Sequence, residues 1–156
     1  MKVSVRGTGK LSKKETKTIV KHLAEHFLGK RLANNLSVTV IYCTLPANYR
    51  GYYGPMEDEE GEETPRPREF CIWISETLGR PTTIKTIIHE MVHVWRTARN
   101  EFRVIGHDCI KWFGETYHCS SDEKDYRKRP WEKECHKFEK TLYKQVESVL
   151  KCEVLA

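Results

Sequence analysis

The chain has 156 residues, of which 38% are hydrophobic and 31% are charged. This composition is typical of one globular domain and excludes a fibrous or wholly disordered protein. The net charge is +5, yet residues 57–63 (EDEEGEE) carry six acids, so the remainder of the chain carries +11. A basic body of this kind favours an anionic partner, and single-stranded DNA is the partner we expect.

The N-terminal residues lack the apolar segment of a signal peptide, and no stretch reaches the roughly 18 apolar residues of a membrane-spanning helix. The six cysteines are scattered without a C-x-x-C pair, which favours reduced thiols. We therefore expect a cytoplasmic or nuclear protein, monomeric and without a membrane partner.

The first half of the chain predicts one helix and two strands. A capping box at Ser12 and Glu15 precedes apolar residues at helical spacing, which predicts a helix over 12–33. Residues 36–43 (LSVTVIYC) and 68–75 (REFCIWIS) are typical of strands. The segment between these strands, residues 46–69, is rich in Gly, Pro and acids, and we expect a long, partly acidic loop.

The second half predicts further helices. A helix is expected over 82–97, a short helix over 107–117 (HDCIKWFGETY), and a polar linker at 118–129. Pro130 then opens a final helix with one apolar stripe. Strands and helices that do not alternate regularly favour the α+β class, with a small mixed sheet packed against three to four helices.

Residues 89–93 (HEMVH) place two histidines four positions apart, with a glutamate after the first. The apolar residues of this helix cluster on one side, while His89 and His93 project from nearly the opposite side. Residues four apart share a helix face, so both imidazoles can bind one zinc ion. Glu90 is turned away from that ion but can reach a water molecule beside it, as a general base must.

A catalytic zinc site takes a third protein ligand and leaves one position open. His107 follows a glycine at the start of the expected short helix and is one candidate. Glu134 flanks the apolar stripe of the final helix and is the alternative metal ligand, whereas Glu132 is expected to project away.

Three segments together, FCIWISETL (70–78), IIHEMVHVWR (87–96) and GHDCIKWFGE (106–115), resemble the SprT-like, or Spartan, metalloprotease domain. The resemblance implies one zincin-like domain over residues 1–156, with His89, His93 and His107 as zinc ligands and Glu90 as the catalytic acid/base. It also implies a zinc metalloendopeptidase that cleaves DNA-associated or DNA-crosslinked proteins in DNA repair.

Residues 129–135 (RPWEKEC) also resemble the glutamate-bearing helix of other H-E-x-x-H peptidases, which use an acid as third ligand. Two alternatives therefore stay open: a peptidase of that kind with a specific protein target, and a zinc-stabilised DNA-binding module without significant proteolysis.

Some contacts to substrate and nucleic acid are also predicted. Trp112 and Lys111 are the expected nucleic-acid contacts, because aromatic rings among cations can stack on unpaired bases. The strand with FCIWIS is expected to be an edge strand that binds extended substrate. Candidate donors to the oxyanion of the reaction are Tyr52, Tyr53, Tyr117 and His118.

Overall fold

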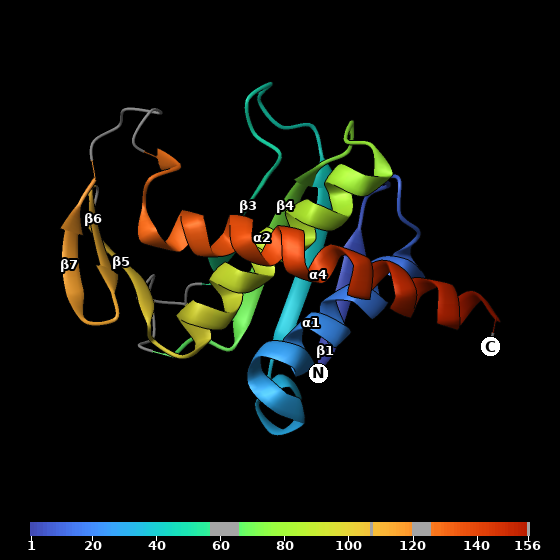
Figure 1. Ribbon diagram of the computed structural model, residues 1–156, viewed down its shortest axis with the longest axis horizontal. Helices are drawn as coiled ribbons and strands as arrows, with labels where there is room; N and C mark the ends of the chain where they lie inside the picture. The colour runs from blue at the N-terminus through green and yellow to red at the C-terminus, as the bar shows by residue number, and fades with distance from the viewer. Residues whose placement is uncertain (57–65, 107, 120–125, 156) are drawn as a thin grey trace.

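A four-stranded mixed sheet forms the centre of the fold in the computed structural model, which describes residues 1–56, 66–106, 108–119 and 126–155 (Figure 1). The strands lie in the order β1-β2-β4-β3, with β1, β2 and β4 parallel and β3 antiparallel to β4. Their bounds are β1 (Lys2–Arg6), β2 (Ser37–Cys43), β3 (Gly51–Pro55) and β4 (Glu69–Ser75).

Three long helices pack with this sheet: α1 (Lys13–Ala33), α2 (Arg80–Ala98) and α4 (Pro130–Leu155). The predicted capping box starts α1, since the Ser12 hydroxyl accepts from the Glu15 N–H at 3.2 Å and the Glu15 carboxylate accepts from the Ser12 N–H at 2.8 Å. In α2, Pro81 lies in the first turn, where a missing N–H costs no helical hydrogen bond. α4 runs across α2 (Figure 1).

The hydrophobic core lies between the sheet and the apolar sides of these helices. Buried and partly exposed residues alternate along β2, whereas β4 also buries Cys71 and Ser75 on its other face. Val38, Val40, Ile72 and Ile74 are fully buried. From α2, the side chains of Ile84, Ile87, Ile88 and Met91 fill the same core. This apolar contact fixes α2 and leaves its other side for a different partner.

A second, three-stranded antiparallel sheet lies at one end of the molecule (Figure 1). Its strands are β5 (Phe102–Gly106), β6 (Cys109–Trp112) and β7 (Glu115–His118). The prediction of a short helix at 107–117 is therefore wrong for its described residues. Phe113 and Gly114 have φ of +48° and +84°, which builds the tight two-residue turn of a hairpin.

Two further predictions, for the loop 46–69 and for the strand with FCIWIS, are also wrong. Residues 51–55 form strand β3 within the expected loop 46–69, because their main chain pairs with the otherwise open side of β4. β4, which holds FCIWIS, is therefore interior, with β2 on one side and β3 on the other. The acidic run at 57–63 lies outside the described residues.

The α+β class and the small mixed sheet agree with the sequence-based prediction. Across the part of the chain that the structure describes, no helix combines the length and the apolar character needed to cross a membrane.

Candidate metal centre

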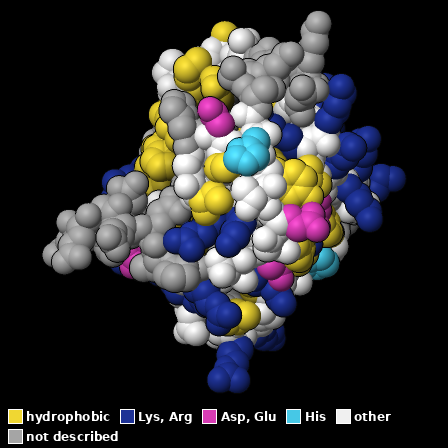
Figure 2. Space-filling model, turned by 90° about the vertical axis from the view of Figure 1, so that its left-hand side faces the viewer, with side chains coloured by type: hydrophobic (Ala, Val, Ile, Leu, Met, Phe, Trp, Pro, Cys, Tyr) yellow, Lys and Arg dark blue, Asp and Glu magenta, His cyan; other side chains and the backbone are white. Residues whose placement is uncertain are grey.

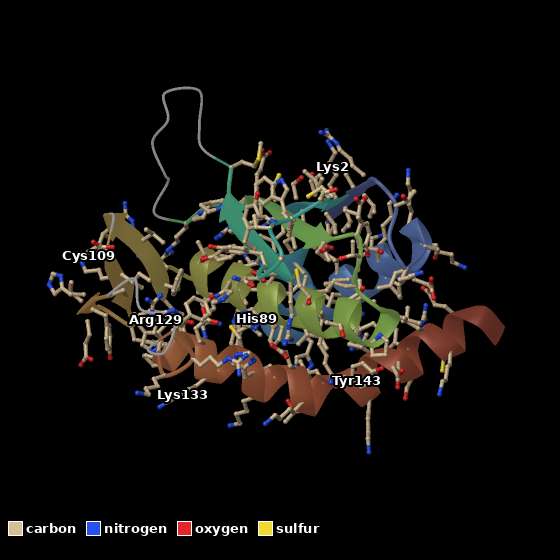
Figure 3. The ribbon with its side chains drawn as sticks, turned by 90° about the horizontal axis from the view of Figure 1, so that it is seen from above. Lys2, His89, Cys109, Arg129, Lys133 and Tyr143 are labelled. Atoms are coloured by element: carbon tan, nitrogen blue, oxygen red, sulfur yellow. The ribbon has the colours of Figure 1, made fainter. Side chains whose placement is uncertain are left out.

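The polar side of α2 meets α4. His89, Glu90 and His93 lie here, and the two helices pair in opposite directions: His89 contacts Glu139, whereas Arg96, further along α2, contacts Glu134. Figure 3 shows His89 between the two helices. Buried ionisable groups therefore gather at this interface, where apolar packing would otherwise be expected.

Glu132 is the central acid of this cluster. Its Oε2 lies 3.1 Å from His89 Nε2 and its Oε1 lies 3.4 Å from His93 Nε2. The residue is only 2% exposed, and Oε2 has no hydrogen-bond partner of good geometry among the described residues. A buried carboxylate oxygen without such a partner is costly, and a cation bound between the carboxylate and the two imidazoles would satisfy it.

The electrostatics show how strongly these groups interact. Burial alone would lower the pKa of His89, but the adjacent carboxylates of Glu132 and Glu139 raise it to about 10. Burial alone would raise the pKa of Glu132, but the adjacent imidazoles of His89 and His93 hold it well below its usual range. Without a metal ion, positive charge on the imidazole side thus compensates the buried carboxylates.

Glu90 is buried next to His89 and His93 but is directed elsewhere. It is 5% exposed, and burial raises the pKa of its carboxyl group while the charges of His93 and His89 oppose this. A Cβ added to Gly51 of β3 would lie 2.7 Å from Thr86 Cγ2 and 3.5 Å from Glu90 Oε1. The absence of a side chain at Gly51 therefore lets β3 approach Thr86 of α2, one turn before Glu90.

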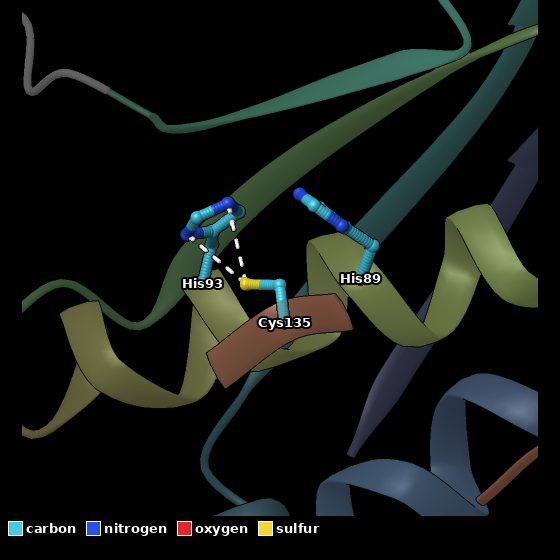
Figure 4. A group of neighbouring side chains, drawn as sticks. All are labelled: His89, His93 and Cys135. Atoms are coloured by element: carbon cyan, nitrogen blue, oxygen red, sulfur yellow. Dashed lines mark hydrogen bonds between the residues drawn. The ribbon is translucent and has the colours of Figure 1, made fainter. Parts of the chain in front are cut away.

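Cys135 also belongs to a group that could hold a metal ion, together with His89 and His93. Its Sγ lies 3.5 Å from Nε2 and 3.8 Å from Nδ1 of His93 (Figure 4). Such similar distances place the sulfur beside the ring and off the in-plane lone pair of either nitrogen. Tyr53 stacks on the same ring, with centroids 5.0 Å apart, so Tyr53 and Cys135 hold the His93 ring in place.

A second group that could hold a metal ion consists of His89, His136 and Glu139. Glu139 Oε1 is 2.7 Å from His89 Nδ1 and 3.0 Å from His136 Nδ1. This group therefore uses the opposite nitrogen of His89 from the one that faces Glu132.

The two acids near the start of α4 differ from the prediction. Glu132 does not project away but faces both imidazoles, so that prediction is wrong. Glu134, the alternative ligand, places both carboxylate oxygens on the Arg96 guanidinium. The apolar stripe of α4 misleads here, because the α2 side that α4 covers is itself partly polar.

His107 lies outside the described residues, and its role as a ligand stays a prediction. The short helix expected from residue 107 onward is replaced by β6 and β7. Sequence reasoning did not single out Tyr126, whose phenol lies close enough to the Glu132 carboxylate to interact with it. Burial and the charges of Glu132 and Glu90 raise the pKa of this phenol.

Three of the four predicted oxyanion donors have other polar partners in the structure, and the role of all four stays a prediction. The Tyr53 hydroxyl pairs with Thr97 Oγ1 at 2.9 Å, and the Tyr52 ring stacks on Trp73. The Tyr117 hydroxyl donates to Glu115, and His118 Nδ1 lies 3.2 Å from Cys109 Sγ.

The predicted nucleic-acid contacts lie on β6. Trp112 is half-buried and packs edge-on against Phe102, whereas Lys111 is exposed. On the face that includes the small sheet, basic side chains are mixed with apolar and acidic ones (Figure 2). Trp112 is therefore a packing residue first, and Lys111 is the accessible member of the pair.

Comparison with known proteins finds no family model that matches this chain, and no curated protein or solved structure matches it.

Proposed function

We propose that this protein is a zinc-dependent peptidase whose protein ligands are His89, His93 and Glu132. The observation that carries the proposal is the buried Glu132 carboxylate, which faces Nε2 of both histidines and keeps one oxygen without a well-formed hydrogen bond. Two imidazoles and one carboxylate are a recurrent ligand set of catalytic zinc. The glutamate-ligand alternative from the sequence thus has more support than the histidine-only set, with Glu132 as its acid.

Zinc held by these side chains would supply Lewis acidity and a water molecule acidic enough to ionise near neutral pH. Glu90 would take up a proton from the attacking water and return it to the leaving amine. Its burial favours this role, because a raised pKa brings a carboxyl group closer to the working pH of a general acid/base. A purely structural, closed zinc site needs no buried acid at this place, which disfavours the DNA-binding module without proteolysis.

Strand β3 is the place where an extended substrate would bind. It is the last strand of the sheet order, so one side of its main chain pairs with no described strand. A peptide can add to such an edge through main-chain hydrogen bonds with little sequence preference. Gly51 in this strand lies next to Glu90, so the added peptide would pass the proposed catalytic group. The SprT-like resemblance and the basic body point to DNA-associated proteins as substrates.

The direct test is cleavage of an unfolded, fluorescently labelled protein by the zinc-loaded chain. We expect hydrolysis by the wild type, loss of hydrolysis after chelation, and recovery on return of zinc. Absence of hydrolysis by a protein that demonstrably contains one zinc ion would contradict the proposal. Glu147→Gln, on α4 and hydrogen-bonded to Tyr143, is the matched control and should cleave as the wild type does.

A further inference from the structure

Glu139 contacts His89, one of the proposed zinc ligands, at the ring nitrogen that faces away from Glu132. It lies two turns after Glu132 on α4 and is 8% exposed. Its Oε1 lies 2.7 Å from His89 Nδ1, whereas His89 Nε2 lies 3.1 Å from Glu132 Oε2. The two nitrogens of one imidazole are thus divided between two carboxylates of the same helix.

This division fixes which nitrogen can bind a metal ion. A neutral imidazole has one N–H and one lone pair, and an ionised carboxylate only accepts hydrogen bonds. If Nδ1–H donates to Glu139, the lone pair is on Nε2 and points toward Glu132 and His93. Carboxylates that accept from the distal nitrogen of a metal-bound histidine fix its tautomer and its orientation.

We infer that Glu139 is a positioning residue that holds His89 with its proton on Nδ1 and its ligand lone pair on Nε2. The inference rests on the proposed metal site but not on peptide hydrolysis. His136 supports the same carboxylate, because its Nδ1 lies 3.0 Å from Glu139 Oε1 and its ring packs edge-on against His89.

The competing reading is a second cation site formed by His89, His136 and Glu139. It conflicts with a first ion at Nε2, because a neutral His89 has no second lone pair to offer at Nδ1. Both sites could be filled together only if the imidazole lost both protons. One ion per chain is therefore expected in either reading. The two readings differ in the proton on His89 Nδ1, which is kept when zinc binds Nε2 and is lost when zinc binds Nδ1.

The experiment measures zinc affinity by competition with a chromophoric chelator for the wild type, Glu139→Ala, Glu139→Gln and Glu147→Gln. We expect a roughly 10–100-fold loss of affinity for Glu139→Ala. The loss should be smaller for Glu139→Gln, because an amide oxygen can still accept from Nδ1–H. Glu147→Gln, hydrogen-bonded to Tyr143 and remote from the ligands, should match the wild type. Circular dichroism confirms that each variant is folded.

A spectroscopic measurement separates positioning from general helix packing. In zinc-loaded wild type, proton–nitrogen NMR should show a His89 Nδ1–H protected from exchange with water, and this protection should be lost in Glu139→Ala. Unchanged zinc affinity in that variant would overturn the inference. Absence of a His89 Nδ1–H in the zinc-loaded wild type would overturn it in favour of the second cation site. If the affinity falls as expected but the wild type cleaves no peptide, the inference stands and the proposed peptidase function fails.

Discussion

The two sides of α2 carry different tasks. Toward the sheet, Ile84, Ile87, Ile88 and Met91 are buried against other apolar side chains. Toward α4, His89 and His93 are largely buried against Glu132, Glu139 and Cys135. Both sides are well packed, but only the second carries groups whose burial is costly without compensation. The apolar side of α2 therefore supplies stability, while the α4 side uses part of that stability to hold reactive groups together.

Replacing Glu90 with Gln should produce the largest effect on turnover and should leave the packing of the apolar side of α2 unchanged. We expect turnover to fall by about three orders of magnitude or more, since the acid/base is removed, while zinc content and thermal stability stay near wild type. Steady-state hydrolysis and metal analysis of the same sample measure both. Cleavage at the wild-type rate would show that the polar cluster does not perform the proposed chemistry.

Replacing Glu132 tests the ligand set directly. Glu132→Ala should lower zinc affinity by more than the roughly 10–100-fold expected for loss of a supporting group. Glu134→Ala should leave zinc affinity near wild type, because Glu134 binds Arg96 and faces neither imidazole in the described contacts. His107→Ala should also bind zinc normally if Glu132 is the third ligand. A steep loss in His107→Ala with normal binding in Glu132→Ala would restore the histidine set implied by the SprT-like resemblance.

Shortening an apolar side chain of α2 that faces the sheet should lower stability and leave zinc binding and turnover unchanged. Ile88 is fully buried, so Ile88→Ala should lower the free energy of unfolding by about 2–5 kcal/mol. Zinc stoichiometry and the turnover of the remaining folded protein should change little. Denaturant titration at a temperature where the variant is folded provides the measurement. A large loss of zinc affinity in folded Ile88→Ala would show that the two sides of α2 are not separable.

The pH dependence of the metal-free protein should come from the α4 side. The pKa of His89 is raised to about 10. Protonated His89 therefore contributes fully to the free energy of unfolding below its ordinary pKa of 6.5, and this contribution is lost as the pH rises through 10. The pKa values of Glu132 and Glu139 are lowered. Their ionised carboxylates therefore contribute to the free energy of unfolding above pH 4.5, and these contributions are lost as the pH falls through the lowered pKa values.

The free energy of unfolding of the chelated protein should therefore be greatest between about pH 4.5 and 6.5 and should fall toward pH 10. Denaturant titrations across this range test it, and His89→Gln should flatten the alkaline limb. Zinc binding should show the opposite trend and strengthen as the pH rises, because its ligands must be deprotonated. Equal stability at pH 6 and pH 10 would argue against a charged cluster.

The smallest expected effect is on affinity for single-stranded DNA, and it depends on residues outside α2. Fluorescence anisotropy with a labelled single strand should show weak binding that falls steeply with salt, since the body charge is +11. Lys111→Ala should reduce the slope of log affinity against log salt by about one. Deletion of the acidic run 57–63 should raise affinity, most clearly at low salt. No binding by the wild type and by the deletion at about 50 mM salt would remove DNA as a partner.

The sequence by itself determined the elements whose signals are local. The capping box and apolar spacing predicted α1, the alternation of residues 70–75 predicted β4, and the four-residue spacing of His89 and His93 placed both on one helix face. These signals depend on periods of 3.6 and 2 residues, which neighbouring positions alone define. They were therefore readable without any partner element.

Tertiary structure decided the rest. Which acid of α4 faces the imidazoles depends on the antiparallel contact of two helices far apart in the chain, and this contact selects Glu132 for the histidines and Glu134 for Arg96. β3 exists because β4 offers it a partner edge, and the turn at Phe113 and Gly114 joins strands that a helical reading of the same residues conceals. In each case the deciding interaction joins segments whose relative position no local period specifies.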